Sequence, residues 1–383
     1  MKRTLSASGG AAVYLIAILV NLGVQLLGSV VLVIAGAASG ETGVSSVLNY
    51  ALMAALQAGF LLSFRLYVKK TDRGVAFPVR MLKWYDMLLC LLSSVICVFC
   101  FIFPAQWFAL LLEKIGYNFS TEIPLDGAPD VVLCVIVTVI VAPVAEELVF
   151  RGALLTGLTK KFGTIPAILL SGLAFSLMHM NPEQTVYQFF IGCACAYFAI
   201  SSGSVLASML LHAGNNLIAL ILEFTGTSFL DVFFSNYAML AVGTAVFLAV
   251  GVTALFFIGR FMVKRERHGA GSGLVFDVKN PKNTENAATS ENPEQTFTTS
   301  SPSGNDQFAS ENFVKARTKT SVFANAVDFI KAENALDEED YALHRTRPPL
   351  LGKRSAVIYL GLGLFACIVT WIMVFAINMS GPA

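Results

Sequence analysis

The sequence predicts an all-α polytopic membrane protein, a transmembrane helical bundle with about eight core spans and one further C-terminal span. Hydrophobic residues make up 56% of the 383 residues and charged residues only 13%, whereas a soluble domain carries about 25% charge. Several apolar stretches also exceed the roughly 20 residues that cross a bilayer as a helix. These stretches are continuous and do not alternate with polar residues, which argues against transmembrane β-strands.

The apolar stretches divide the chain into nine predicted spans. They lie near Ala11–Ala35, Val47–Val68, Tyr85–Leu112, Val131–Leu158, Thr164–His179, Val186–Ile200, Val205–Leu222, Tyr237–Val263 and Ala356–Ile377. The links Thr159–Gly163 and Ser201–Ser204 are short, so the spans on either side of each link must be antiparallel neighbours.

Basic residues indicate how the chain is oriented. They gather in loops that fall on one side of the membrane if the spans alternate: Lys2, Arg3, Lys69, Lys70, Arg80, Lys160, Lys161, Lys264, Arg265, Lys353 and Arg354. The positive-inside rule then predicts a cytoplasmic N-terminus and an outer C-terminus, in the cell membrane. The net charge is only +1. This total gives no information about nucleic acid binding. From the apolar spans, the expected surroundings are the lipid bilayer, and no nucleic acid partner is expected.

Composition separates three blocks along the chain. Residues 1–262 form the predicted bundle. Residues 263–354 are rich in Asn, Ser, Thr and Glu, and this segment cannot bury enough apolar surface to fold, so we expect it to be disordered in the cytoplasm. Residues 355–383 hold the last span, which looks like an accessory anchor because a long polar segment precedes it.

Three charged residues lie inside the apolar run Val131–Leu158: Glu146, Glu147 and Arg151. Each costs roughly 2.5–3.5 kcal/mol at mid-bilayer, so they must face protein or a wet cavity. Glu147 and Arg151 are spaced i, i+4 and can form an ion pair. Glu146 is rotated about 100° from Glu147. It is free to face a cavity and act as a general base on water. A buried ion pair with a purely structural role is the alternative.

Two histidines lie in other apolar segments. His179 ends the stretch Phe175-x-x-x-His179, and His212 shares a helix face with Asn216 at i, i+4. Imidazole can bind a metal, donate to an oxyanion or transfer a proton, and an amide can stabilise an oxyanion. Polar packing contacts are the alternative. Counted from the cytoplasmic span ends, Glu146 lies roughly 18 Å deep, His179 roughly 22 Å and His212 only roughly 10 Å.

In chain order, these residues resemble the motifs of the CPBP family, which comprises CAAX-processing endopeptidases and bacteriocin-processing or bacteriocin-immunity proteins. The motifs are Glu146-Glu147-x-x-x-Arg151, Phe175-x-x-x-His179 and His212-x-x-x-Asn216. Each motif alone is weak, whereas the ordered set on separate apolar segments is specific. The resemblance covers residues 131–222.

The resemblance implies a membrane-embedded CAAX-type endopeptidase. Glu146 would activate water, with Glu147 and Arg151 as its supporting pair. His179, His212 and Asn216 would complete the catalytic site, and Phe175 would support it. The implied substrate is a peptide or protein at the membrane.

Two schemes are open for the chemistry. Glu146, His179 and His212 could hold one divalent metal ion, with zinc as the first choice, and water in the fourth position. Without a metal, Glu146 would activate water while His179 and Asn216 hold the oxyanion. The HExxH spacing of many zinc proteases is absent from the sequence.

The leading hypothesis is hydrolysis of a peptide bond through a water that Glu146 activates. A second hypothesis is a non-enzymatic immunity or scaffold protein of the same fold. The third is a transporter, because intramembrane carboxylates and histidines also form proton relays. Against transport, the charged segment shows no clear internal repeat.

Overall fold

The computed structural model describes residues 5–39, 46–71, 78–117, 127–226, 230–268 and 356–379. Most of the polar segment predicted to be disordered lies outside the described residues. The helices are α1 (Ala7–Ser39), α2 (Ser46–Thr71), α3 (Trp84–Lys114), α4 (Ala128–Val135), η1 (Ile136–Val141), α5 (Ala142–Glu147), η2 (Leu148–Leu155), α6 (Thr156–Phe162), α7 (Thr164–Met178), α8 (Thr185–Ser202), α9 (Val205–Thr225), α10 (Asp231–Phe234), α11 (Tyr237–His268) and α14 (Ala356–Ile377).

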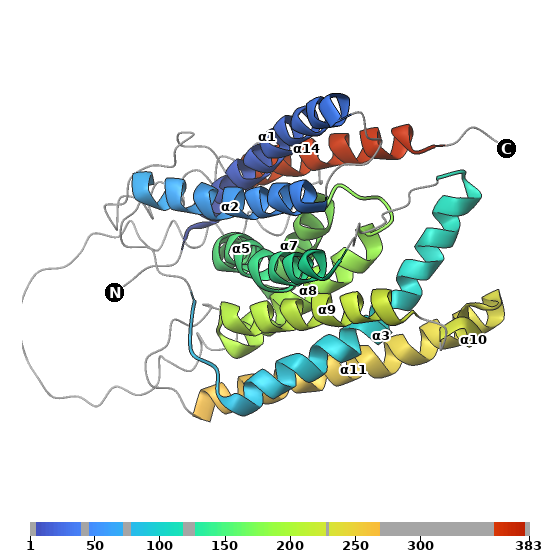
Figure 1. The fold of residues 1–383 in the computed structure, drawn as a ribbon. Helices are drawn as coiled ribbons and strands as arrows, with labels where there is room; N and C mark the ends of the chain where they lie inside the picture. The colour runs from blue at the N-terminus through green and yellow to red at the C-terminus, as the bar shows by residue number, and fades with distance from the viewer. Residues whose placement is uncertain are drawn as a thin grey trace, which may run out of the picture.

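The described parts of the chain form a polytopic helical bundle, as the sequence predicts. They contain no β-strand, and eight of their helices are long and apolar enough to cross a membrane. The segment α7 is a shorter apolar helix of 15 residues. Successive long helices run in alternating directions, so that α1 begins and α14 ends at opposite ends of the bundle (Figure 1). The fold class is confirmed, and the protein is an integral multi-pass membrane protein.

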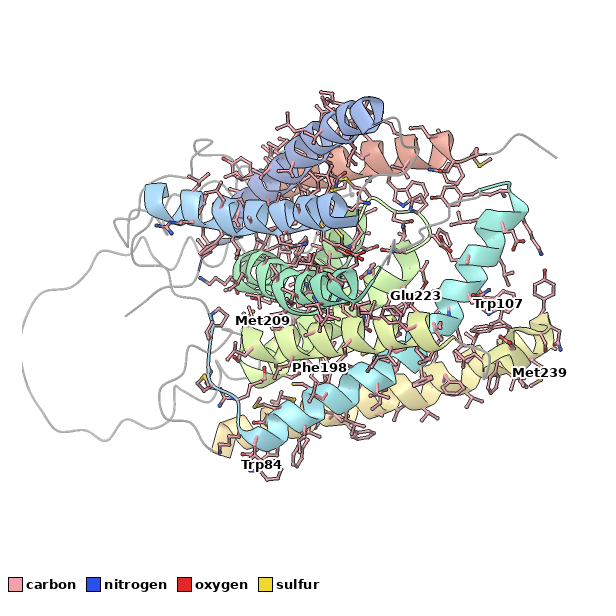
Figure 2. The ribbon with its side chains drawn as sticks, viewed as in Figure 1. Trp84, Trp107, Phe198, Met209, Glu223 and Met239 are labelled. Atoms are coloured by element: carbon pink, nitrogen blue, oxygen red, sulfur yellow. The ribbon has the colours of Figure 1, made fainter. Side chains whose placement is uncertain are left out.

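Tryptophan side chains mark the two ends of the bundle. Trp84 and Trp107 lie toward opposite ends of α3 (Figure 2). Trp84 is largely exposed, and the indole N–H of Trp107 donates to Thr244 Oγ1 at 3.0 Å. Such positions are typical of the aromatic belts at membrane–water interfaces.

The charged span is continuous from α4 to α6 but changes its helical register twice. The segments η1 and η2 are π-helical, and π-turns are rare and frequent at functional sites. The short α5 between them carries both glutamates and lies in the middle of the bundle in Figure 1. Helices α2 and α9 pack against α5, so side chains from both helices can reach the glutamates.

Glycines let neighbouring helices approach the charged span closely. A Cβ atom built on Gly10 of α1 would lie 2.5 Å from the carbonyl oxygen of Ala153 in η2. A Cβ on Gly192 of α8 would lie 2.9 Å from the Cα of Gly172 in α7. Because real Cβ atoms do not occupy such distances, these crossings require glycine. They fix α1, α7 and α8 around the site.

The last helix is part of the bundle core rather than a separate anchor. Helix α14 packs against α1, where Gly363 makes room for the ring of Tyr14. The Tyr14 hydroxyl lies 3.7 Å from Cys367 Sγ, and Trp371 donates to Thr185 Oγ1 of α8 at 2.8 Å. The expectation of an accessory anchor is thereby corrected, since a tether in sequence does not prevent close packing in space.

The turn between α8 and α9 is buried beneath the segment that precedes α3. Ser204 is 0% exposed, and its hydroxyl donates to the carbonyl oxygen of Arg80 at 2.7 Å. The Arg80 guanidinium donates to the carbonyl oxygen of Ser202 at 2.8 Å. The start of α9 is therefore covered by the segment that precedes α3.

Candidate active site

Glu147 and Arg151 form a fully buried ion pair on one face of the charged span. Their closest atoms, Glu147 Oε1 and Arg151 Nη1, are 2.9 Å apart, and both side chains are 0% exposed. Arg151 Nη2 also donates to the carbonyl oxygen of Gly192 in α8 at 2.8 Å. The i, i+4 spacing predicts this pair, and its location explains how the bundle tolerates the two charges.

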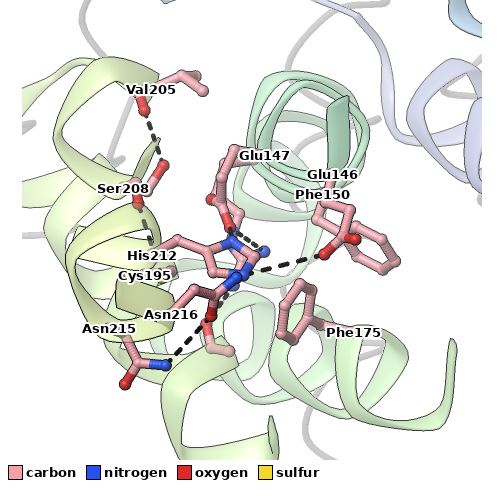
Figure 3. A network of polar contacts seen from close by, with 12 residues as sticks. Glu146, Glu147, Phe150, Phe175, Cys195, Val205, Ser208, His212, Asn215 and Asn216 are labelled. Carbon is pink, nitrogen blue, oxygen red and sulfur yellow. Dashed lines mark hydrogen bonds and ion pairs between the residues drawn. The ribbon is translucent and has the colours of Figure 1, made fainter. Parts of the chain in front are cut away.

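His212 is held by the same carboxylate. Its Nδ1 donates to Glu147 Oε1 at 3.0 Å, because an ionised carboxylate can only accept. The proton on Nδ1 leaves Nε2 as the proton-accepting nitrogen of the neutral ring. This Nε2 lies 4.0 Å from Glu146 Oε2, as the dashed lines in Figure 3 show. Glu147 thus orients the imidazole toward the second glutamate.

Glu146 is buried, and only one of its two carboxylate oxygens has a hydrogen-bond partner among the described residues. Its Oε1 accepts a hydrogen bond from Gln57 Nε2 of α2 at 3.0 Å. Its Oε2 is buried and has no hydrogen-bond partner among the described residues. A carboxylate oxygen without a partner is expensive to bury unless it has a task. Oε2 of Glu146 is therefore a free acceptor of this site, and Oε2 of Glu147 is a second buried carboxylate oxygen without a hydrogen-bond partner among the described residues.

The ring of Phe175 lies at the centre of the polar residues. The guanidinium of Arg151 lies 4.5 Å from the centre of this ring. The rings of His179 and His212 lie 4.9 Å and 5.4 Å away, both in edge-to-face arrangements. The ring of Phe175 is fully buried, so it fixes the relative positions of both imidazoles without adding a polar group.

His179 directly follows the last residue of α7, and the proton on its ring is placed by its hydrogen-bond partner. Its Nδ1 donates to the carbonyl oxygen of Phe175 at 2.9 Å, because a carbonyl oxygen can only accept. Its Nε2 is then a proton acceptor in the neutral ring and a donor only in the imidazolium. The oxyanion role expected of His179 requires a hydrogen-bond donor, so it requires the imidazolium form.

Asn216 bridges α9 to the π-helical segment η1. Its amide donates to the carbonyl oxygen of Thr138 at 2.9 Å. In π-helical spacing the partner of this carbonyl would be residue 143, which is Pro143 and has no N–H. The preceding N–H, that of Ala142, bonds to the carbonyl oxygen of Val137. Asn216 therefore supplies the hydrogen bond that Pro143 cannot.

The structure brings most of the predicted site residues into one place. Glu146, Glu147, Arg151 and His212 form one network, and Phe175 contacts His179, His212 and Arg151. One hydrogen of the Asn216 amide is donated to the backbone carbonyl oxygen of Thr138. Sequence reasoning missed Gln57 and the hydrogen bond from Tyr187 to Asn215, at 2.8 Å. A lone glutamine in an apolar span was the only signal for Gln57.

A metal ion would need several nitrogen, oxygen or sulfur ligands close together. Among the residues that the structure describes, no three His, Cys, Asp or Glu side chains are grouped so as to hold a metal. A catalytic zinc site takes three protein ligands at about 2.0–2.2 Å. Glu146, His179 and His212 have suitable chemistry for zinc, and a metal held by these three residues stays a prediction.

Comparisons with known proteins point to the same part of the chain. Residues 128–218 match the family model described as type II CAAX prenyl endopeptidase Rce1-like. An uncharacterized protein of Mycoplasma capricolum subsp. capricolum (strain California kid) is 34% identical over 95 residues. That match covers 24% of this chain and 27% of the relative, so the chain spans about a quarter of its length. No solved structure matches significantly. Residues 128–218 thus carry an Rce1-like domain, which confirms the resemblance of this segment to the CPBP family.

Proposed function

We propose that the protein is an intramembrane endopeptidase that hydrolyses a peptide bond in a membrane-associated peptide or protein. One observation carries the proposal. Glu146 Oε2 is buried without a hydrogen-bond partner among the described residues, and it lies 4.0 Å from His212 Nε2. Both atoms can contact the oxygen of one water at hydrogen-bond distance. The match to the endopeptidase family supports the assignment.

In the proposed reaction, Glu146 accepts a proton from water as the new oxygen–carbon bond forms at the substrate carbonyl. The carbonyl π electrons move to its oxygen, which becomes an oxyanion. When the oxyanion collapses, the carbon–nitrogen bond breaks. Glu146 then returns its proton to the leaving amine, so that one water is consumed for each peptide bond broken and Glu146 is regenerated. His212 Nε2, which lies 4.0 Å from Glu146 Oε2, accepts a hydrogen bond from the same water and orients it.

The Glu147–Arg151 pair has an indirect role in this scheme. Glu147 Oε1 holds Nδ1 of His212 at 3.0 Å, and Arg151 compensates the Glu147 charge at 2.9 Å. A carboxylate on Nδ1 fixes the tautomer and stabilises the imidazolium that forms if His212 takes up a proton. The pair therefore positions His212 and does not touch the substrate.

Oxyanion stabilisation falls to His179 and Asn216 in our proposal. Asn216 keeps one amide hydrogen beyond the bond to Thr138. His179 can donate to the oxyanion only through Nε2 of the imidazolium, because its Nδ1 donates to the carbonyl oxygen of Phe175. Donors aimed at the developing charge contribute about 2.7–4 kcal/mol each in other hydrolases. This scheme uses only side chains of this chain.

The membrane arrangement follows from the alternating helices. We propose that the N-terminus is cytoplasmic, because α2 and α11, whose last turns carry basic residues, end at the end of the bundle where α1 begins (Figure 1). In this orientation the polar segment of residues 263–354 is cytoplasmic and α14 ends outside. The substrate reaches Glu146 from the bilayer or from its surface, as a peptide segment next to a membrane anchor.

The test compares protein termini in membranes from the native host, with its chromosomal copy deleted and wild type, Glu146→Gln or Glu113→Gln supplied at matched levels. Glutamine keeps the shape of Glu146 and can still accept the hydrogen bond from Gln57, but it is not a base. Glu113 lies exposed near the end of α3 and serves as the matched control. We expect new termini with wild type and Glu113→Gln only. Identical termini in all three membranes would refute proteolysis and favour an immunity or scaffold protein.

A further inference from the structure

We propose that Gln57 of α2 is a positioning residue that holds the Glu146 carboxylate in its reactive orientation. The inference rests on the proposed endopeptidase function. Gln57 lies 89 positions before Glu146 and donates to its Oε1 at 3.0 Å. It stands outside residues 128–218, the part of the chain that matches the endopeptidase family. The site would then depend on a helix that the recognised segment does not contain.

The orientation of the Gln57 amide is set by charge. A carboxylate accepts and cannot donate, so the amide must turn its Nε2 toward Glu146 and its own oxygen away. The Gln57 side chain is 9% exposed, and its Oε1 is buried without a hydrogen-bond partner in the described part of the chain. Among the described residues, the amide nitrogen of Gln57 donates to Glu146 Oε1.

A purely structural role explains this arrangement less well. Polar side chains do join helices in membranes, and each such bond contributes about 0.6 kcal/mol on average. A structural hydrogen bond would gain little here, because the burial of Gln57 leaves one half of the amide unsatisfied. Buried and incompletely paired polar groups are characteristic of functional sites rather than of packing surfaces.

The hydrogen bond from Gln57 gives the two oxygens of Glu146 different roles. Oε1 is occupied by Gln57, which leaves Oε2 as the atom that faces His212 Nε2 at 4.0 Å. Without Gln57 the carboxylate can rotate about its terminal torsion, which has a broad energy profile. This rotation would move Oε2 away from the water that Glu146 must deprotonate. A displacement of about 1 Å at a reacting group can cost about a hundredfold in rate.

The experiment uses Gln57→Met and Gln57→Asn in the full-length protein in detergent micelles. Methionine has a similar length without a donor, and asparagine keeps the amide one methylene short of Glu146. The matched control is Gln25→Met, because Gln25 donates to Asn21 Oδ1 within α1, away from the site. The substrate is a peptide that spans a cleavage site found in the comparison of termini. Thermal unfolding of each variant is measured alongside kcat and KM.

We expect both Gln57 variants to lower kcat by about tenfold to a hundredfold, with KM within about threefold of wild type. Gln25→Met should leave both constants unchanged. An unchanged kcat in a folded Gln57 variant would overturn the positioning role, as would a loss of activity in proportion to lost folded protein. Absence of cleavage by wild type itself would instead refute the proposed function, so the two failures are distinguishable.

Discussion

The carboxylate of Glu147 accepts a hydrogen bond from Nδ1 of His212 at 3.0 Å, although 65 positions separate the two residues. The same oxygen, Oε1, lies 2.9 Å from Nη1 of Arg151. One carboxylate oxygen therefore joins a guanidinium of its own span to an imidazole of α9. This arrangement links the two roles that the sequence leaves open for the ion pair, because the pair that compensates charge also orients His212.

The first prediction concerns that ion pair. Arg151→Leu leaves Glu147 as a buried charge without its guanidinium, which should lower the free energy of unfolding by about 3–5 kcal/mol. Glu147→Leu combined with Arg151→Leu removes both charges and should recover most of that loss. Activity should stay low in the double variant, because nothing orients His212. Chemical unfolding in detergent and peptide cleavage measure the two effects.

The exposed Arg260 of α11 provides the control for this experiment. Arg260→Leu should change the free energy of unfolding by no more than about 0.5 kcal/mol. A double variant as unstable as Arg151→Leu alone would contradict the view that the unpaired charge causes the loss. Full activity in the double variant would contradict the role of Glu147 in orienting His212.

The second prediction separates the two nitrogens of His212. In His212→Asn the amide nitrogen can replace Nδ1 and still donate to Glu147, whereas nothing replaces Nε2. The variant should keep its thermal unfolding midpoint within a few degrees, since about 1 kcal/mol shifts the midpoint by only about 2–4 °C even in a chain of about 150–250 residues. Its cleavage activity should fall by at least about a hundredfold. His212→Leu should lose both stability and activity. Retained activity in His212→Asn would exclude Nε2 from the reaction.

The sequence alone predicts well those features that depend on residues close together in the chain. The apolar runs give the helical spans, and the i, i+4 spacing gives the Glu147–Arg151 pair, because both depend on helical geometry over a few residues. The proximity of Phe175, His179 and His212 follows from the ordered motifs of a known family rather than from spacing. No local pattern signals the contact from Gln57, since it depends on how α2 crosses α5.

The depth of His212 shows where a one-dimensional count fails. The count assumes that every helix begins at the membrane surface, and it places His212 at roughly 10 Å against roughly 18 Å for Glu146. In the structure the first residue of α9, Val205, is buried, and its N–H donates to the carbonyl oxygen of Pro78 at 2.8 Å. His212 lies beside both glutamates all the same, with Nδ1 3.0 Å from Glu147 Oε1 and Nε2 4.0 Å from Glu146 Oε2.

The third prediction addresses the metal. Because no three candidate ligands are grouped in the part of the chain that the structure describes, cleavage should persist after treatment with 1,10-phenanthroline and dialysis into metal-free buffer. Elemental analysis of the active sample should find less than about one zinc per ten chains, against the one ion per chain that a catalytic zinc site requires. Loss of activity that zinc restores would contradict the metal-free scheme and support Glu146, His179 and His212 as ligands.

The last prediction tests whether Asn216 serves the backbone or the substrate. Asn216→Leu removes the donor to the Thr138 carbonyl oxygen, which should cost about 1–3 kcal/mol because a buried acceptor loses its partner. Pro143→Ala returns an N–H at the position that pairs with Thr138 in π-helical spacing. The double variant Pro143→Ala/Asn216→Leu should therefore be more stable than Asn216→Leu alone.

Activity in the same set of variants assigns the remaining amide hydrogen. If Asn216 also donates to the oxyanion, the double variant should regain stability while its kcat stays about a hundredfold below that of Pro143→Ala, in the range found for lost oxyanion donors. Recovery of kcat together with stability would show that Asn216 acts only through η1. Pro143→Ala alone is the matched reference, because it isolates the effect of the new N–H on the helix that carries Glu146.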